Sequence, residues 1–413
     1  MPKKLNTKPD TKPKAANTKK KTFLQKLNAK SGIEVIPVSD AIPNENTFYT
    51  DTGSYTFNAI ISGSIFGGIP SDTIVGLAGE QGTGKTYVCL ESAKHFLDAH
   101  PNGVVEYYET EGAVKLHMIV ARQIPEDRIS LIRVDSVEQF QYMLANRIKG
   151  YNEMAEDERE PMFFVLDSLG NISSEMELKQ STIAVDKKKK DMSRAREIKG
   201  VFRVLALKLA RANLPLIVTN HVYADMMKKT KPGTPPAKRM GGGEGLYYAA
   251  STIIFLAKSP DYDEVTKTYR GSILTATLFK SRNTLEHLKI KTRLDFRTGM
   301  DRYFGLFDVA KQFGIAKNES NGFRMGEKFF HLKNVNEHPE EYFTEDVLKA
   351  IDEMVQKAFC YGKGVPMELI DQDVDDDGTE FEIDQEEAAP APEPLDDTEA
   401  VKEALTKKKS PKK

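Results

Sequence analysis

Short apolar runs alternate with longer stretches of helical periodicity along the middle of the chain. Four runs have the length and composition of buried strands and lie at 73–78, 162–166, 214–218 and 252–256. One helix is predicted over 86–99 and another over 193–212, where Val201, Leu205 and Leu209 recur every four residues. This alternation predicts an α/β fold with a mainly parallel sheet that helices cover on both faces.

The apolar pattern fades toward both ends of the chain. Residues 1–30 contain ten lysines against a single Asp10, and residues 368–403 are rich in Asp and Glu with Ala-Pro repeats, before a basic tip at 407–409. Segments of this composition bury too little apolar surface to offset the entropy lost on ordering. They predict a disordered basic arm over 1–30 and a disordered acidic tail with a basic tip over 368–413.

Three segments are expected between these ends. An N-terminal linker or oligomerisation segment is predicted at 31–58, and the α/β core at 59–310. A small C-terminal subdomain is predicted at 311–367 because an apolar helix is expected over 347–359.

The composition narrows the class of protein. Of 413 residues, 29% are charged and 39% hydrophobic, and the formal net charge is −2. No apolar run approaches the roughly 18 residues of a membrane helix, and the lysine-rich start lacks the apolar region of an export signal. The expectation is a cytoplasmic protein that does not bind membranes. With only two cysteines, Cys89 and Cys360, a disulfide scaffold and a zinc knuckle are excluded.

A phosphate-binding loop lies between the first predicted strand and the helix that follows. Residues 79–86 read Gly-Glu-Gln-Gly-Thr-Gly-Lys-Thr, which fits the P-loop pattern. The glycines let successive backbone N–H groups point at phosphate oxygens beside the positive helix N-terminus. Lys85 is expected to neutralise the β and γ phosphates, and Thr86 to offer its hydroxyl to Mg²⁺. The predicted contacts to ATP are Gly79, Glu80, Gln81, Gly82, Thr83, Gly84, Lys85, Thr86 and Tyr87.

Acidic residues at strand ends are candidates for the chemistry of this site. Asp167 follows the apolar run 162–166, where a P-loop enzyme needs a carboxylate for the metal ion, although an Asp after a strand is more often a turn residue. Hydrolysis also needs a group that positions water, and Glu109 and Glu111 end another strand. Glu111 is nearer the loop, but spacing alone leaves the odds near even, with a solvated surface pair as the alternative.

Further motifs follow in order along the chain: Phe-Val-Leu-Asp-Ser-Leu-Gly-Asn at 164–171, Asp-Met-Ser-Arg-Ala-Arg at 191–196, Thr-Asn-His at 219–221 and Arg-Met-Gly-Gly-Gly at 239–243. Together they resemble the RecA-type recombinases, and within these the UvsX recombinases of T4-like phages. The resemblance extends over about 60–314. Ordered matches of this kind are more specific than a P-loop, which many unrelated functions share.

The resemblance implies a RecA-like core that polymerises head to tail into a helical filament, with ATP and Mg²⁺ bound between protomers and single-stranded DNA along the axis. For a phage protein the location would be the host cytoplasm. It assigns the role of catalytic glutamate to Glu111 and of γ-phosphate sensor to His221. Lys280 and Arg282 match basic residues that reach the neighbouring protomer's ATP, so the predicted catalytic set is Lys85, Glu111, His221, Lys280 and Arg282.

Without the resemblance, His221 would be interpreted as a satisfied histidine of the core or sheet edge, and Lys280 and Arg282 as a solvated strand end. The chain also departs from the family at one position. Where the family often places an aromatic residue against adenine, seven residues after the catalytic glutamate, this chain has Met118. A thioether contact is therefore expected in place of base stacking.

Two lysine-bearing loops are candidates for DNA binding, at about 173–193 and 222–245. A lysine run alone is usually a solvated face, but both loops are expected at the same edge of the sheet, and their charge suits a phosphate backbone. The glycines at 241–243 can bring backbone amides close to phosphate, and Arg196 and Arg203 lie seven residues apart where the family has DNA-facing arginines. The predicted DNA-binding residues are Lys187, Lys188, Lys189, Lys190, Arg196, Arg203, Lys228, Lys229, Lys238, Arg239, Gly241, Gly242 and Gly243.

The sequence thus predicts a DNA-stimulated ATPase for homologous recombination, which forms filaments on single-stranded DNA and exchanges strands with a homologous duplex. Expected partners are both DNA forms, further copies of the chain, and single-strand-binding and mediator proteins. One alternative is a hexameric RecA-core helicase, which closes into a ring. Another is a recombination mediator that does not exchange strands, against which the complete ATPase motifs weigh.

Overall fold

The computed structural model describes residues 47–181, 193–224, 238–242, 244–263, 266–362 and 381–383, together with Phe23, Leu27 and Lys30. Contacts divide the chain into Met1–Thr47 and Phe48–Lys413. In the first unit, Phe23, Leu27 and Lys30 have helical backbone and exposed side chains. All the labelled elements belong to the second unit. No helix in these described ranges has both the length and the apolar character needed to cross a membrane.

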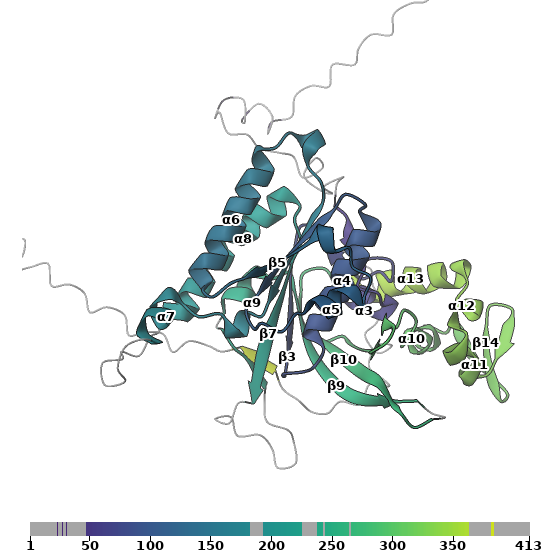
Figure 1. Ribbon diagram of the computed structural model, residues 1–413. Helices are drawn as coiled ribbons and strands as arrows, with labels where there is room; N and C mark the ends of the chain where they lie inside the picture. The colour runs from purple at the N-terminus through teal and green to yellow at the C-terminus, as the bar shows by residue number, and fades with distance from the viewer. Residues whose placement is uncertain are drawn as a thin grey trace, which may run out of the picture. The chain divides into compact units, whose positions relative to one another are not determined.

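The second unit is built on one large sheet (Figure 1). The strand order along it is β12-β11-β10-β9-β3-β7-β6-β4-β5. Its parallel strands are β3 (Ile74–Gly79), β4 (Val104–Glu109), β5 (Ile129–Arg133), β6 (Met162–Asp167), β7 (Leu216–Ala224) and β9 (Thr252–Tyr262). An antiparallel extension follows with β10 (Tyr269–Ser281), β11 (Lys289–Asp295) and β12 (Gly299–Met300). The four predicted buried strands correspond to β3, β6, β7 and β9.

Helices cover both faces of this sheet. One face carries α3 (Tyr55–Ser62), α4 (Lys85–Ala99) and α5 (Leu116–Val120), and the other carries α6 (Val137–Glu153), α8 (Ser193–Ala212) and α9 (Gly245–Ala249). Buried side chains form a separate hydrophobic cluster on each face. On β6, Phe163 and Val165 join the first cluster, whereas Phe164 and Leu166 join the second, as the two-residue period of a strand requires. The predicted α/β class is confirmed.

The C-terminal region extends the first hydrophobic cluster. It contains α10 (Leu306–Gln312), β13 (Ala316–Glu319), β14 (Gly322–Met325), β15 (Lys328–Phe330), α11 (Leu332–Glu337), α12 (Pro339–Tyr342) and α13 (Glu345–Phe359). The predicted helix 347–359 lies within α13. The buried Asp352 of α13 accepts hydrogen bonds from Ser64 Oγ at 2.7 Å and from Ile65 N at 2.8 Å, so the helix is joined to the loop after α3.

Short elements complete the described chain. They are β1 (Tyr49–Thr50), β2 (Ile69–Pro70), η1 (Glu126–Arg128), η2 (Glu156–Glu158), η3 (Leu169–Asn171), α7 (Glu175–Ser181), β8 (Lys238–Met240) and β16 (Phe381–Ile383). Strand β8 pairs with β7 on one side and with β16 on the other. The three residues of β16 belong to the predicted acidic tail, where the sequence pattern indicated no strand.

Candidate active site

The sheet brings four candidate segments to one edge, where the parallel strands end. They are the P-loop after β3, the acidic residues at the end of β4, Asp167 at the end of β6 and His221 near the end of β7. Because β3, β7, β6 and β4 are adjacent in that order, the segments that follow their carboxyl ends are neighbours. Gly79 is the backbone partner of His221, and Glu109 is that of Asp167. Ligands of open α/β sheets bind at this edge. The order of the strands therefore brings together candidate residues that lie far apart in the sequence.

The P-loop curls between β3 and α4 as its glycines predict. Gly82 has φ 73° and Gly84 has φ 90°, a backbone region that side chains disfavour. Lys85 Nζ donates hydrogen bonds of 2.9 Å to the carbonyl oxygens of Gly79 and Glu80. Burial lowers the pKa of Lys85 below the ordinary lysine value, although Asp167 and Glu111 oppose this shift. The lysine therefore lies under the loop, in reach of two carboxylates.

A cavity of about 310 Å³ opens beside this loop. At its polar end lie residues 81–86 of the P-loop with Glu111, Asp167 and His221. At its apolar end lie Tyr87, Met118 and Phe296, and the remaining lining residues are Leu294, which lies against Gly84, with Ala113, Lys258 and Ser272. The structure therefore brings together Gln81, Gly82, Thr83, Gly84, Lys85, Thr86, Tyr87, Glu111, Asp167 and His221 from the predicted set.

Several lining residues were missed by sequence reasoning. Lys258, Ser272, Leu294 and Phe296 come from the strands β9 to β11 and the turn after them, and no motif marks them. Lys258 Nζ donates to the carbonyl oxygen of Gly82 at 2.6 Å, which links β9 directly to the P-loop. Only the position of β9 next to β3 in the sheet, which local sequence does not encode, could have identified them.

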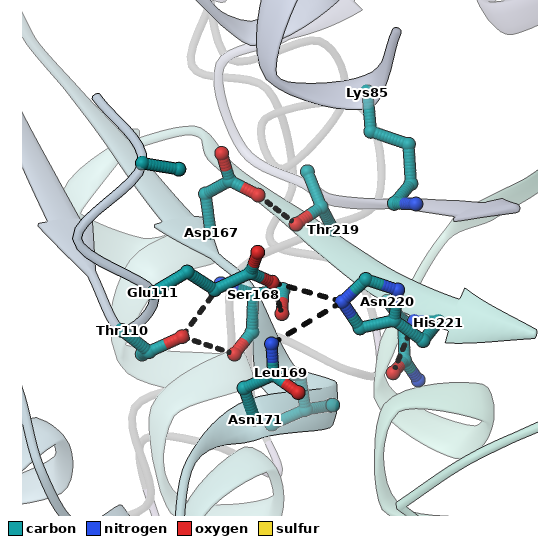
Figure 2. A network of polar contacts seen from close by, with 12 residues as sticks. Lys85, Thr110, Glu111, Asp167, Ser168, Leu169, Asn171, Thr219, Asn220 and His221 are labelled. Atoms are coloured by element: carbon teal, nitrogen blue, oxygen red, sulfur yellow. Dashed lines mark hydrogen bonds and ion pairs between the residues drawn. The ribbon is translucent and has the colours of Figure 1, made fainter. Parts of the chain in front are cut away.

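Asp167 is fixed by three hydroxyl groups. Its Oδ2 accepts hydrogen bonds of 2.7 Å from Thr86 and from the buried Tyr107. Its Oδ1 accepts one of 2.5 Å from Thr219, which Figure 2 shows. A carboxylate next to a threonine hydroxyl is the hard oxygen set that Mg²⁺ takes in phosphate sites, together with phosphate oxygens and water. The residues present therefore fit the predicted metal ion.

Glu111 contacts residues from two neighbouring strand ends. Its Oε1 accepts a hydrogen bond of 2.6 Å from Ser168 Oγ and lies 2.8 Å from His221 Nε2, and Asn171 Nδ2 lies 3.4 Å from the same nitrogen (Figure 2). Burial raises the pKa of Glu111, but the hydrogen bonds from Ser168 and His221 bring it below the ordinary glutamate value. The carboxylate is therefore ionised at neutral pH.

Glu109 has a different environment. It is buried, and its Oε1 accepts a hydrogen bond of 2.5 Å from the backbone N–H of Ala113. This contact closes the turn that presents Glu111 to the cavity. The two acids that spacing could not separate therefore differ in their surroundings: one holds the turn and the other lines the cavity.

The described ends of the two predicted DNA loops lie next to the site. Arg194 at the start of α8 donates hydrogen bonds to the carbonyl oxygens of Leu169, Gly170 and Ile172. Arg196 and Arg203 are both exposed on α8. The predicted Lys187, Lys188, Lys189, Lys190, Lys228, Lys229 and Gly243 lie outside the described residues.

The exit of the second loop is attached to β7. Asn220 Nδ2 donates to the carbonyl oxygen of Gly241 at 2.7 Å, and the N–H of Gly241 donates to the carbonyl oxygen of His221 at 3.2 Å. Gly242 has φ 81°. Lys238 and Arg239 pair in the ladder with Ala224 and Tyr223. The backbone after β8 thus follows the strand that carries His221.

Lys280 and Arg282 lie at the end of β10, outside the described lining of the cavity. Lys280 Nζ lies 4.8 Å from the centre of the Tyr247 ring and donates to the carbonyl oxygen of Tyr247. Arg282 donates to the carbonyl oxygen of Tyr248 at 3.1 Å. Both cations therefore hold the negative C-terminal end of α9. Their predicted contact with a neighbouring protomer stays a prediction.

Comparisons with known proteins give two informative matches. The chain is 28% identical over 267 residues to the recombination and repair protein of Enterobacteria phage T4. The aligned region covers 64% of each of the two chains. It is 24% identical over 211 residues to the DNA repair and recombination protein RadB of Thermoplasma acidophilum, covering 51% of this chain and 80% of RadB. The chain therefore spans just under two thirds of the phage protein's length. A scan against models of protein families finds no match.

Proposed function

The motifs, the fold and both curated matches agree in their likeness to the RecA-type recombinases, and from this premise we propose that the chain is an ATP-dependent recombination protein. It binds Mg-ATP, assembles head to tail on single-stranded DNA, and pairs that strand with a homologous duplex. Strand exchange follows, and DNA-stimulated hydrolysis of ATP releases the assembly. ATP serves here as a switch of DNA affinity.

The observation that carries the proposal is the contact between His221 and Glu111. His221 lies on β7, the strand that enters the second lysine-bearing loop, and its Nε2 lies 2.8 Å from Oε1 of the acid that lines the cavity. A group at this place touches both the nucleotide site and the loop that would hold DNA. Occupancy of the cavity can thereby bias the loop, and DNA on the loop can bias the acid.

The residues divide the work at the polar end of the cavity. Lys85 and the P-loop amides hold the phosphates, and Thr86 and Asp167 hold Mg²⁺, which supplies charge neutralisation at the transferring phosphoryl group. Glu111 accepts a hydrogen bond from the attacking water and orients it. Ser168 fixes this carboxylate through its hydroxyl, so Glu111 is held ready before the nucleotide arrives.

The apolar end of the cavity suits the base. The rings of Tyr87 and Phe296 have centroids 6.3 Å apart, and the guanidinium of Arg122 lies 4.4 Å from the centre of the Tyr87 ring. Met118 lines the same end, which supports the expected thioether contact. We assign adenine to this end, between Met118 and Phe296, because aromatic and thioether groups pack against a π face.

Completion of the site requires a second protomer in this proposal. Lys280 and Arg282 reach the ATP of the neighbour and stabilise the charge that spreads over the transferring phosphoryl group. DNA phosphates are held by the exposed Arg196 and Arg203 and by the two lysine-bearing loops. Such contacts are independent of base sequence and weaken as salt increases.

The test is the rate of ATP hydrolysis with and without single-stranded DNA. We expect DNA to stimulate the unmodified chain, and Lys85→Ala to lower the stimulated rate by about a hundredfold or more. Lys94→Ala is the matched control, since Lys94 lies on the same helix and pairs with Asp98 at the surface. A rate that DNA does not change would refute the proposal.

Electron microscopy and strand exchange separate the related functions. Open helical filaments on DNA support a recombinase, whereas closed rings would indicate the hexameric helicase. Strand exchange by the purified chain alone supports a recombinase, whereas its absence in filaments that hydrolyse ATP would indicate a mediator.

A further inference from the structure

An ion pair joins the P-loop to the exit of the second lysine-bearing loop. Lys238 Nζ lies 3.3 Å from Glu80 Oε1. Glu80 is the second residue of the P-loop, directly after β3, and Lys238 is the first residue of β8. The side chain of Lys238 is 21% exposed and that of Glu80 is 61% exposed. The contact is therefore partly shielded on the lysine side and open to solvent on the glutamate side.

Glu80 is also a centre of hydrogen bonding inside the P-loop. Its carbonyl oxygen accepts from Thr83 N at 3.3 Å, from Thr83 Oγ1 at 2.9 Å and from Lys85 Nζ at 2.9 Å. The backbone of this residue holds the lysine that is proposed to bind phosphate, and its side chain holds β8. Glu80 therefore connects Lys85 to Lys238 through its own backbone and side chain.

Strand β8 is in turn attached to β7. Val222 pairs with Met240 and Tyr223 with Arg239, and Asn220 binds the backbone of Gly241. Because Gly79 is the partner of His221 in the ladder, Glu80 follows a residue that is already next to β7. The ion pair thus closes a ring of contacts that runs from β3 through β7 and β8 back to the P-loop.

We propose that Glu80 and Lys238 are positioning residues that couple the nucleotide loop to the DNA loop, by a route separate from the contact between His221 and Glu111. The inference rests on the proposed function and deepens it. It also gives Lys238 a role other than the predicted contact with a DNA phosphate. Coupling of this kind is reciprocal, so DNA on the loop alters ATP binding as much as ATP alters DNA binding.

The two roles of Lys238 differ in what Glu80→Gln should do. If Lys238 only contacts phosphate, removal of a nearby negative charge leaves DNA binding unchanged or makes it tighter, and maximal stimulation is unaffected. If the pair couples the loops, Glu80→Gln lowers the maximal stimulation of ATP hydrolysis even at saturating DNA. The maximal stimulation at saturating DNA therefore separates the two roles, because it is unchanged in the first case and lowered in the second.

The experiment is a double-mutant cycle with Glu80→Gln, Lys238→Gln and both together, measured as ATPase rate against DNA concentration and against ATP concentration. We expect each single variant to lower the maximal stimulation about two- to fivefold, the range for a partly exposed ion pair. The double variant should be no worse than either single one. Lys238→Arg keeps the charge and should retain stimulation. In the single variants, the KM for ATP should respond less to DNA than in the unmodified chain.

A matched control and the contrary outcomes complete the test. Glu345→Gln with Lys349→Gln removes a surface pair on α13 and should change neither rate nor KM. Additive losses in the cycle, or an unchanged maximum in Glu80→Gln, would overturn the coupling while leaving the proposed function intact. An unmodified chain that DNA does not stimulate would overturn both.

Discussion

At the scale of single residues, surroundings decide what spacing leaves open. Glu109 and Glu111 are two positions apart and chemically identical, yet Glu109 accepts a backbone hydrogen bond from Ala113 and Glu111 faces the cavity. Asp167 shows the same principle, because three hydroxyl donors from α4, β4 and β7 fix both its oxygens. Such contacts set the orientation of each acid, and at Glu111 the hydrogen bonds from Ser168 and His221 also lower the pKa below the ordinary glutamate value, against the effect of burial.

Glu111→Gln tests the proposed role of this acid. Glutamine keeps the size of the side chain but lacks the negative charge with which the carboxylate holds the attacking water. We therefore expect DNA-stimulated hydrolysis to fall by about a hundredfold or more. ATP binding and filament assembly should persist, because neither requires the carboxylate. Hydrolysis is measured by phosphate release, and filaments are observed by electron microscopy.

The control for this variant is Glu109→Gln, whose amide oxygen can still accept from Ala113. It should hydrolyse ATP at close to the unmodified rate. The dependence of the hydrolysis rate on pH gives a second check. Hydrogen bonds from Ser168 and His221 lower the pKa of Glu111, so its carboxylate stays ionised as the pH falls from neutral into the ordinary glutamate range. Loss of this charge should therefore not lower the rate over that interval. Normal turnover in Glu111→Gln would remove the assignment.

At the scale of elements, the sequence predicts what is locally encoded. Strands β3, β6, β7 and β9 are buried apolar runs, and α8 has its predicted bounds because Val201, Leu205 and Leu209 mark one face. The polar end of the cavity follows from these elements, since motif residues stand at their ends. The P-loop and Asp167 could be predicted from the rule that ligands bind where parallel strands end, whereas the roles of Glu111 and His221 came from the resemblance to a known family.

The part of the cavity lining that comes from β10, β11 and the turn after β11 could not be predicted in the same way. Ser272, Leu294 and Phe296 reach the site because β10 and β11 extend the sheet next to β9, and this order depends on long-range pairing. Strand β16 is a second case, since an acidic segment pairs with β8 through its backbone. Backbone pairing leaves little trace in the pattern of apolar residues.

The charge of Lys280, at the end of β10, leads to a prediction about how the rate of hydrolysis depends on pH. Burial lowers the pKa of Lys280 to about 8, the positive charge of Arg282 contributes to this lowering, and Glu286 opposes it. The side chain is therefore a cation below about pH 8 and loses its charge above it. If the cation acts on the neighbour's ATP, stimulated hydrolysis falls as the pH rises through that value.

The measurement is the DNA-stimulated rate from neutral to alkaline pH, compared with Lys280→Arg. Arginine keeps its charge throughout this range, so the decline should move to higher pH in that variant. A profile that is the same for both proteins would show that the charge of Lys280 is not required.

At the scale of the whole molecule, one protomer carries two halves of the proposed site. The cavity holds Lys85, Glu111 and Asp167, whereas Lys280 and Arg282 bind the end of α9. Head-to-tail assembly would bring the cations of one copy to the cavity of the next, as a heterologous interface allows. In the proposed function, hydrolysis would then depend on assembly, and assembly would depend on DNA.

This division predicts complementation between two inactive proteins. Lys85→Ala lacks the phosphate lysine but keeps the cations, and the double variant Lys280→Ala with Arg282→Ala keeps the cavity but lacks the cations. Each alone should hydrolyse ATP slowly. In an equal mixture, about a quarter of the interfaces combine an intact cavity with intact cations, so up to about a quarter of the unmodified rate should return. A chain with all three substitutions, mixed with Lys85→Ala, offers no intact cavity and should restore nothing. Mixed filaments that do not recover hydrolysis would place the whole chemistry within one protomer.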